Sequence, residues 1–179
     1  MQLSQVLRQL LPLPSLDGAR NALRDAWDLL SGLPGGRVIF SRIVGRIAPY
    51  TGSIGATVVE LRPGFAQVVM PDRRAVRNHL QSVHAAALAN LAECAGNMAL
   101  AYSLPDDARF IVTGLEIEYV KKARGAITAL AECQVPGSAA RAEYPISISL
   151  RDGSGEEVAR VLLHSLVGPK PGQDRAQFN

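Results

Sequence analysis

The sequence predicts an α+β fold in which an antiparallel sheet wraps around one long central helix, preceded by a helical N-terminal extension. Two observations carry this prediction. One long apolar segment, residues 82–102, has the composition of a buried helix. Two short runs of alternating or β-branched residues precede it and four follow it, all separated by turn residues. A single helix inserted early among antiparallel strands favours a sheet wrapped around that helix.

Residues 1–48 are expected to form the helical extension. Residues 2–11 carry apolar side chains at helical spacing. Residues 16–32 form a second such stripe, with Ser15 or Asp17 as its N-cap. The letters LPGG then separate these two helices from the rest of the chain. Because the extension is too short for a core of its own, we expect it to be a cover or an interface element.

Residues 49–168 are expected to form the main domain, with residues 169–179 as a C-terminal tail. Its strands are expected at residues 53–61, 65–70, 111–122, 127–135, 144–151 and 157–167. One helix in a two-layer arrangement leaves part of its own surface uncovered. We therefore expect a second subunit to cover the helix in a homodimer.

Composition limits the possible functions. The chain has 179 residues, 47% of them hydrophobic, and a formal net charge of +3, which fits one globular domain. It has no Lys/Arg tract and only 5% aromatic residues, so nucleic-acid binding is not expected. No window reaches the roughly 18 apolar residues of a membrane span, and the N-terminus lacks the features of a signal peptide. We expect a cytoplasmic protein with no membrane partner and with Cys94 and Cys133 as reduced, buried thiols.

The long helix carries polar residues that its apolar composition does not explain. Its segment reads RNHLQSVHAAALANLAECAGNMALAY at residues 77–102. Asn90, Glu93 and Asn97 lie at i, i+3 and i+7, within roughly 60° of one another on one face. His84 precedes Glu93 by nine residues, so the two project from opposite sides, about 13 Å apart along the helix. They could meet over one substrate only if two such helices pack side by side in a dimer.

This pattern resembles the hotdog fold over about residues 50–168. It is similar in particular to the acyl-CoA thioesterases of the phenylacetate-pathway and 4-hydroxybenzoyl-CoA type, and to a group of small bacterial hotdog proteins of unassigned activity. The most specific part is the spacing of Asn78, His84 and Glu93, with LAE where such thioesterases have LAD or LAE. In those families a loop Asn or Gln precedes HGG at the helix start, and a catalytic Asp or Glu lies inside the helix.

The resemblance implies a role for each matching residue. Asn78 matches the loop amide, and His84 matches the histidine at the helix start. Ala85 stands where those families have the glycine whose backbone N–H polarises the thioester carbonyl. Glu93 matches the nucleophile or general base, and Asn97 a position that often carries a polar side chain. HGG reads HAA in this sequence, which retains the backbone donor and narrows the approach of the thioester.

The resemblance also implies a substrate and an assembly. It implies hydrolysis of an acyl-CoA or acyl-carrier thioester at a subunit interface, in a homodimer or in a dimer of dimers (a homotetramer). Coenzyme A would enter as part of the substrate, with no separate cofactor and no metal. Its phosphates would lie against the cations Arg73, Lys121, Lys122 and Arg124. No P-loop, GxSxG, HExxH, CxxC or GxGxxG motif is present.

Other interpretations stay open for the same residues. Glu93 could be a structural strut paired with Arg or Lys, His84 a helix cap, Asn78 an ordinary turn residue, and the cations a solvated charge run. For the whole protein, the HAA sequence allows a non-catalytic acyl-CoA-binding hotdog protein. A third alternative is a structural subunit whose N-terminal helices recruit a partner.

Overall fold

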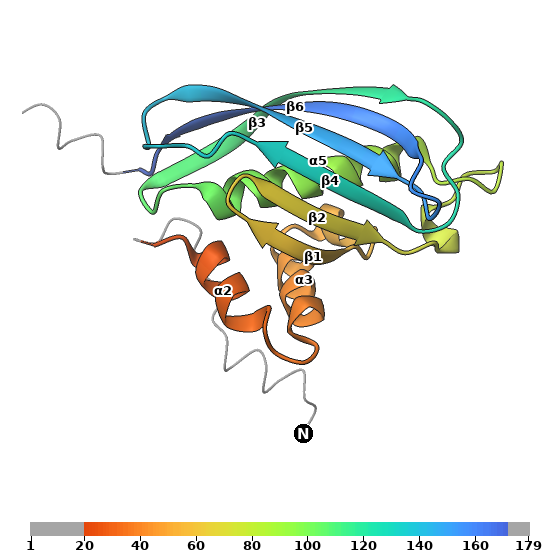
Figure 1. The fold of residues 1–179 in the computed structure, drawn as a ribbon, viewed down its shortest axis with the longest axis horizontal. Coiled ribbons are helices and arrows are strands. Elements are labelled where there is room, and N and C mark those ends of the chain that lie inside the picture. The colour runs from red at the N-terminus through yellow and green to blue at the C-terminus, as the bar shows by residue number, and fades with distance from the viewer. Residues whose placement is uncertain (1–19, 172–179) are drawn as a thin grey trace, which may run out of the picture.

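The computed structural model describes residues 20–171, and its architecture is the predicted α+β arrangement (Figure 1). The helix expected at residues 2–11 and most of the expected tail lie outside the described residues. The elements are, in chain order, α2 (Ala22–Leu30), α3 (Gly36–Ile47), α4 (Pro49–Gly52), β1 (Thr57–Arg62), β2 (Phe65–Met70), the 3-10 helix η1 (Arg74–Val76), α5 (Ala85–Ser103), β3 (Ala108–Tyr119), β4 (Ile127–Cys133), β5 (Ala142–Arg151) and β6 (Glu157–Pro169).

The six strands form one antiparallel sheet in the order β1-β2-β4-β5-β6-β3. This order is not a simple meander, because the chain that leaves α5 crosses to the far edge of the sheet. There β3 pairs with β6 over its whole length, from Ala108 opposite Pro169 to Tyr119 opposite Ala159. Consequently β1 and β3 are the two edge strands.

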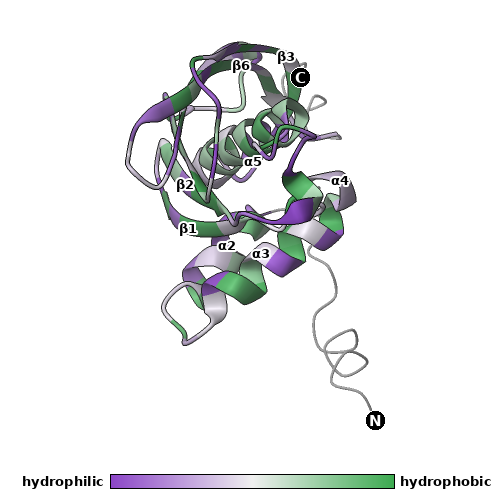
Figure 2. Cartoon of the chain, turned by 90° about the vertical axis from the view of Figure 1, so that its right-hand side faces the viewer, coloured by the Kyte–Doolittle hydropathy of each residue, from purple (hydrophilic) through white to green (hydrophobic). Residues whose placement is uncertain are grey.

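The sheet curls around α5, which lies along its inner face (Figure 2). Inward residues of the strands are apolar and buried, as with Ile146, Ile148 and Leu150 of β5. On the helix side, Gly96 allows a close approach, since a Cβ added there would lie 2.6 Å from Cδ2 of Leu163 on β6. The core therefore lies between α5 and the sheet, as the sequence predicted.

The helices α2 and α3 form a hairpin below β1 (Figure 1). Trp27 and Phe40 are both buried and pack edge to face, with ring centroids 5.1 Å apart. A Cβ at Gly36 would overlap the backbone carbonyl of Leu30, so the turn between the helices requires glycine there. The predicted helix at 16–32 is shorter than expected, and Asn21 caps it.

The N-terminal helices are tied to the rest of the domain by hydrogen bonds from polar side chains. The Oγ of Ser41 on α3 accepts from the N–H of Val58 on β1 at 2.9 Å. Asn21 Nδ2 donates to the carbonyl of Ala101 near the end of α5 at 2.7 Å. Within residues 20–171 no helix is both long and apolar enough to cross a bilayer.

Candidate functional site

His84 is the N-cap of α5. Its Nδ1 accepts from the N–H of Ala86 at 3.1 Å, and its own backbone N–H donates to the carbonyl of Val76 at 2.8 Å. Because Nδ1 is an acceptor, the neutral ring carries its proton on Nε2. The side chain is exposed, so Nε2–H is available to a ligand at the start of the helix. His84 is thus a helix cap that also presents a donor.

The N–H of Ala85 is the donor that remains at the start of α5. None of the hydrogen bonds among residues 20–171 engages it, and the residue is exposed. The first N–H groups of a helix lack intrahelical partners and carry the positive end of the helix dipole. The hydroxyl of Tyr119, at the end of β3, donates to the carbonyl of Ala85 at 3.2 Å. Tyr119 lies 34 residues away, and nothing in the sequence signalled this contact.

Asn78 shapes the loop that leads into α5. Its Oδ1 accepts from the N–H of Leu80 at 2.9 Å, and from the N–H and Oγ of Ser82 at 3.2 and 3.1 Å. Gln81 between them has φ 58°, in the left-handed region. The Nδ2 group of Asn78 makes no hydrogen bond with any described residue. The oxygen of the amide is therefore used by the fold, while its N–H groups are available.

Glu93 lies on the face of α5 that the sheet leaves uncovered. Ala89, Glu93 and Asn97 are half-buried at i, i+4 and i+8, whereas the helix neighbours of Glu93, Ala92 and Cys94, are buried. Glu93 makes no hydrogen bond or ion pair with a described residue, so the interpretation as a strut lacks a partner there. Burial, and secondarily the charge of Glu93, raises the pKa of the Cys94 thiol to about 12.

The polar stripe of α5 divides into two parts. Asn90 is buried, and its Nδ2 donates to the carbonyl of Tyr50 on α4 at 3.0 Å, which ties the two helices together. Asn97 differs, because its buried Oδ1 has no hydrogen-bond partner among the described residues. Buried polar atoms are nearly always paired, so this unpaired oxygen is unusual within the described chain.

Nothing within the described chain brings His84 and Glu93 together. His84 precedes the first turn of α5, and Glu93 follows two and a half turns later, about 13 Å along the axis. Each lies exposed or half-exposed without a contact to the other. A single copy therefore holds the two ends of the expected site apart.

The predicted phosphate-binding cations differ in their surroundings. Lys121 forms an ion pair with Asp152 at 2.8 Å and a second one with Glu156, and these partners raise its pKa. Arg73 donates through Nη2 to the carbonyl of Ser53 at 3.1 Å. Lys122 and Arg124 are exposed and take part in none of the ion pairs among residues 20–171.

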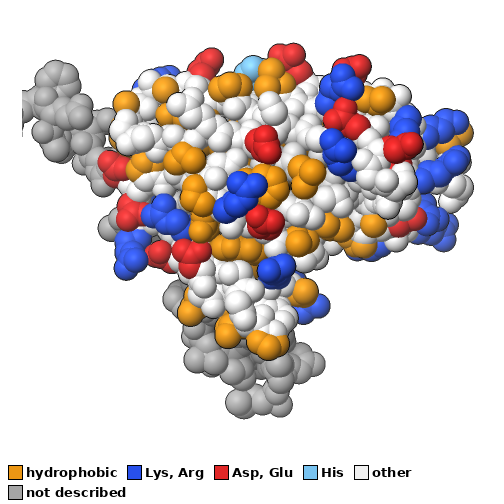
Figure 3. Space-filling view, in the orientation of Figure 1, with side chains coloured by type: hydrophobic (Ala, Val, Ile, Leu, Met, Phe, Trp, Pro, Cys, Tyr) orange, Lys and Arg blue, Asp and Glu red, His pale blue; other side chains and the backbone are white. Residues whose placement is uncertain are grey.

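These cations nevertheless lie near the start of α5. The carbonyl of Ala123, between Lys122 and Arg124, accepts from the N–H of Val83 at 2.9 Å, and η1 is joined to His84 by its bond to Val76. Figure 3 shows Lys and Arg side chains gathered at the right-hand end of the molecule, where Figure 1 places these loops. The start of α5 therefore lies in positively charged surroundings.

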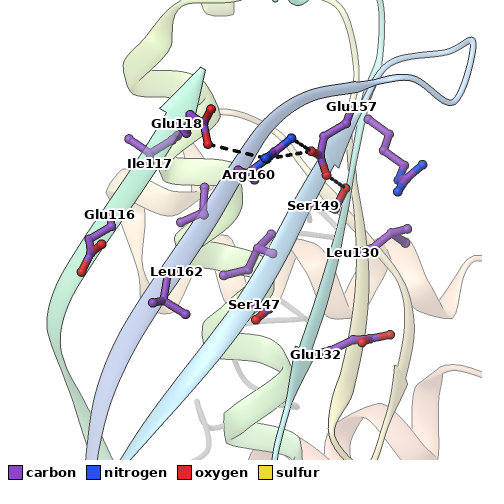
Figure 4. Close-up of a pocket in the computed structure, with 13 residues that line it drawn as sticks. Glu116, Ile117, Glu118, Leu130, Glu132, Ser147, Ser149, Glu157, Arg160 and Leu162 are labelled. Carbon is purple, nitrogen blue, oxygen red and sulfur yellow. Dashed lines mark hydrogen bonds and ion pairs between the residues drawn. The ribbon is translucent and has the colours of Figure 1, made fainter. Parts of the chain in front are cut away.

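A hollow of the described surface lies elsewhere, on the outer face of the sheet. Its volume is about 780 Å³, and it is open over β3, β6, β5 and β4, with α5 behind the sheet (Figure 4). The hydroxyl of Ser149 donates to Glu157 at 2.7 Å, and Arg160 pairs with Glu157 at 2.9 Å; the Ser149 bond and then the Arg160 pair lower the pKa of that carboxyl. Residues 20–171 contain no cluster of His, Cys, Asp and Glu arranged to hold a metal.

Comparison with solved structures identifies the fold. A protein described as genomics APC5556 is 31% identical, with a TM-score of 0.71 over 82% of this chain and 98% of that chain. PA5026 from Pseudomonas aeruginosa, a protein of unknown function described as a probable thioesterase, is 24% identical, with a TM-score of 0.66 over 76% of this chain and 97% of that one. The thioesterase HI1161 from Haemophilus influenzae is 14% identical, with a TM-score of 0.63 over 73% and 91%. The predicted hotdog fold is confirmed.

Comparison with models of protein families shows the family to which the chain belongs. No protein with curated functional information matches it. Residues 36–167, from the start of α3 almost to the end of β6, match the family described as "Domain of unknown function (DUF4442)". Because this match covers well over half of the sequence, the chain belongs to the DUF4442 family, on a hotdog fold.

Proposed function

We propose that the protein hydrolyses acyl-CoA or acyl-carrier thioesters. The observation that carries the proposal is the pair of unused groups on α5: the N–H of Ala85 at its start and the half-buried carboxylate of Glu93 on its uncovered face. One is suited to an oxyanion and the other to activating a nucleophile. Solved structures with the same fold include proteins described as thioesterases, which supports this reaction class.

The proposed site is shared by two copies of the chain. The edge strand β3 is 12 residues long, and its outer edge has no neighbouring strand in the described sheet. Long unpaired edges are prone to pair with another chain. Antiparallel pairing of two β3 strands about a twofold axis would continue the sheet and place the two α5 helices side by side. Glu93 of one copy would then face the Ala85 end of its partner.

The chemistry follows from these positions. The N–H of Ala85 donates to the thioester carbonyl, with the helix dipole stabilising the developing negative charge. Glu93 either accepts a proton from the attacking water or attacks the carbonyl carbon itself. In the first route, the water oxygen forms the new C–O bond, the C–S bond breaks, and the thiolate of coenzyme A takes up the proton. In the second route, the carboxylate oxygen forms the new C–O bond as the C–S bond breaks and the thiolate leaves, and water then hydrolyses the resulting anhydride and restores the carboxylate. Asn78 Nδ2 and His84 Nε2–H would contact the substrate, and Lys122 and Arg124 would contact its phosphates.

The proposal is tested by measuring the hydrolysis of a panel of acyl-CoA esters through the free thiol that is released. The panel includes short, long and aromatic acyl groups. On any substrate that is turned over, Glu93→Gln should lower kcat by about 10²–10⁴-fold, since it removes the proposed base without changing shape. Glu143→Gln, at an exposed position of β5, is the matched control. Full activity in Glu93→Gln would refute the assignment.

A non-catalytic acyl-CoA-binding role is the second candidate. The observation that favours it is that alanines follow His84, and that the N–H of Ala86 is already bonded to His84 Nδ1. That bond removes one donor from the site, and the two methyl groups leave less space for a tetrahedral intermediate than two glycines would. Saturable binding of acyl-CoA without thiol release would support this role, and absence of both binding and turnover would exclude both candidates.

A further inference from the structure

We propose that the α2–α3 hairpin docks on the surface of an anionic phospholipid bilayer. The apolar end of the hairpin would enter the interfacial region, and arginines of α3 would lie at the level of the lipid phosphates. This inference is independent of the proposed hydrolysis. It replaces the expectation of no membrane partner with a peripheral contact, consistent with the lack of a membrane-spanning helix among the described residues.

The first observation is an exposed apolar tip at the turn of the hairpin. The tip consists of Leu29, Leu33, Val38 and Ile39, which are 71%, 55%, 42% and 41% exposed. Figure 3 shows hydrophobic atoms at the lower end of the molecule, where Figure 1 places this hairpin. Single exposed aliphatic residues are common, but four at one protruding turn form a patch that favours contact with an apolar phase.

The second observation is the charge around the tip. Residues 29–59 contain no Asp or Glu and three arginines, Arg37, Arg42 and Arg46. The whole hairpin, residues 22–47, has four arginines and two acids, Asp25 and Asp28, and therefore a net charge of +2. Arg37, Arg42 and Arg46 are exposed, and none of them takes part in an ion pair among residues 20–171. Unpaired cations beside an apolar patch are typical of proteins that bind anionic membranes.

The spacing along α3 matches the layers of a bilayer. Arg42 and Arg46 follow Val38 at i+4 and i+8 on the outward side of the helix, about 6 and 12 Å back from the tip. Apolar faces of interfacial helices enter the bilayer by about 5–10 Å. With Val38 at that depth, the two guanidinium groups lie among phosphates, to which arginine can donate two parallel hydrogen bonds.

The hairpin is also rigid enough to present this surface without rearrangement. The packing of Trp27 on Phe40 and the tight turn at Gly36 fix the two helices relative to each other. The bonds from Asn21 fix the hairpin to α5. A preorganised surface loses little entropy on binding.

Charge distinguishes the lipid surface from the other possible occupants. A second copy packed on the same patch by a twofold axis would place these arginines near their own copies, which is unfavourable. Residues 1–19 contain one arginine, Arg8, and one acid, Asp17, so they offer no net negative charge. Anionic headgroups complement both the tip and the arginines.

Flotation of the full-length protein with lipid vesicles tests the inference. We expect binding to vesicles of phosphatidylcholine with phosphatidylglycerol, weaker binding to phosphatidylcholine alone, and a decrease as salt is raised. The double variant Arg42→Gln/Arg46→Gln should weaken partitioning about 25-fold, or about fivefold for each cation removed. Leu29→Ser/Leu33→Ser should weaken it at least about tenfold. Arg141→Gln, at an exposed loop position, is the matched control and should bind normally.

Several outcomes would overturn the inference. They are no binding of the full chain at low salt, binding that the hairpin variants leave unchanged, and binding that appears only after residues 1–19 are removed. The last would show that this segment covers the patch. Emission from Trp27, the single tryptophan and a buried one, checks that each variant keeps the hairpin folded.

Discussion

Replacing Ala85 with proline tests the oxyanion role of a single N–H group. Proline lacks this donor and is favoured at the first position of a helix, which Ala85 occupies. The preceding residue, His84, has φ −67° and ψ 139°, the extended conformation that a residue before proline prefers. The N–H of Ala85 makes no hydrogen bond within the described chain, so the fold loses none. The bond from Tyr119 to the Ala85 carbonyl remains possible.

The expected effects on stability and activity therefore differ widely. A proline compatible with its backbone changes the free energy of unfolding by only about 1 kcal/mol or less. Loss of one oxyanion donor lowers kcat about 10²–10³-fold, equivalent to about 2.7–4 kcal/mol of transition-state stabilisation. Thiol release from the best acyl-CoA substrate measures kcat, and urea unfolding measures stability on the same samples.

Ala85→Gly is the matched control for this experiment. It retains the N–H and removes only the methyl group, so kcat should be equal to or higher than that of the wild type. The reasoning would be refuted if Ala85→Pro were folded and as active as Ala85→Gly, because the N–H would then contribute nothing to the reaction.

Three further predictions concern the fold and the thiols. Gly96→Ala should lower the free energy of unfolding by about 1–3 kcal/mol in urea titrations, because its methyl group would press on Leu163. An unchanged unfolding midpoint would contradict the close approach of α5 to β6 at this position. Asn21→Ala should lower the free energy of unfolding by about 2 kcal/mol in the same assay, because it removes the helix cap and two further side-chain hydrogen bonds. A decrease of less than about 1 kcal/mol would contradict the role of Asn21 in fixing the hairpin to α5. Burial raises the pKa of the Cys94 thiol to about 12, so Cys94 should react with a thiol reagent at pH 8 only after unfolding, and fast reaction of this thiol in the native protein would contradict its burial. Cys133 is only half-buried and not fully buried as expected; burial raises its pKa to about 11, so it should react more slowly than a free thiol.

The long helix and the strands could be predicted because their local patterns agree with their final environment. The alternation of buried isoleucines with serines in β5 is visible in the sequence, and so is the uninterrupted apolar composition of α5. The helix expected at residues 82–102 begins at Ala85, because His84 is its cap. Element type follows from local residues, whereas exact ends depend on individual hydrogen bonds.

Helices α3 and α4 were missed for a related reason. The segment of α3 is rich in β-branched residues and contains Gly45, which lowers intrinsic helix propensity. Packing decides in favour of the helix, because Phe40 is buried against Trp27 and Ser41 bonds to β1. Such stabilisation comes from residues distant in the sequence, and no local pattern shows it.

The sequence predicts that Asn90, Glu93 and Asn97 lie on the long helix, and they do. It does not predict which distant residues the polar side chains contact. The spacing of the polar residues along α5 can be predicted from the sequence, including the separation of about 13 Å between His84 and Glu93 along the helix axis. Two contacts cannot be predicted in this way: the bond of Asn90 to Tyr50, 40 residues away, and the pairing of Lys121 with Asp152. Tertiary structure brings these residues together. Because Asn90 bonds to Tyr50 and Lys121 pairs with Asp152, neither residue is a partner of Glu93 within the described chain.

Complementation between two inactive variants tests most directly the central claim of a shared active site. Glu93→Gln and Ala85→Pro subunits, carrying different tags, are co-expressed and the mixed dimer is purified. In a site shared between subunits, the mixed dimer contains one fully wild-type site and one site with both substitutions, so it should show about half of the wild-type kcat per dimer. If each site lies within one chain, both sites stay defective, and a mixed dimer as inactive as its parents would contradict the account.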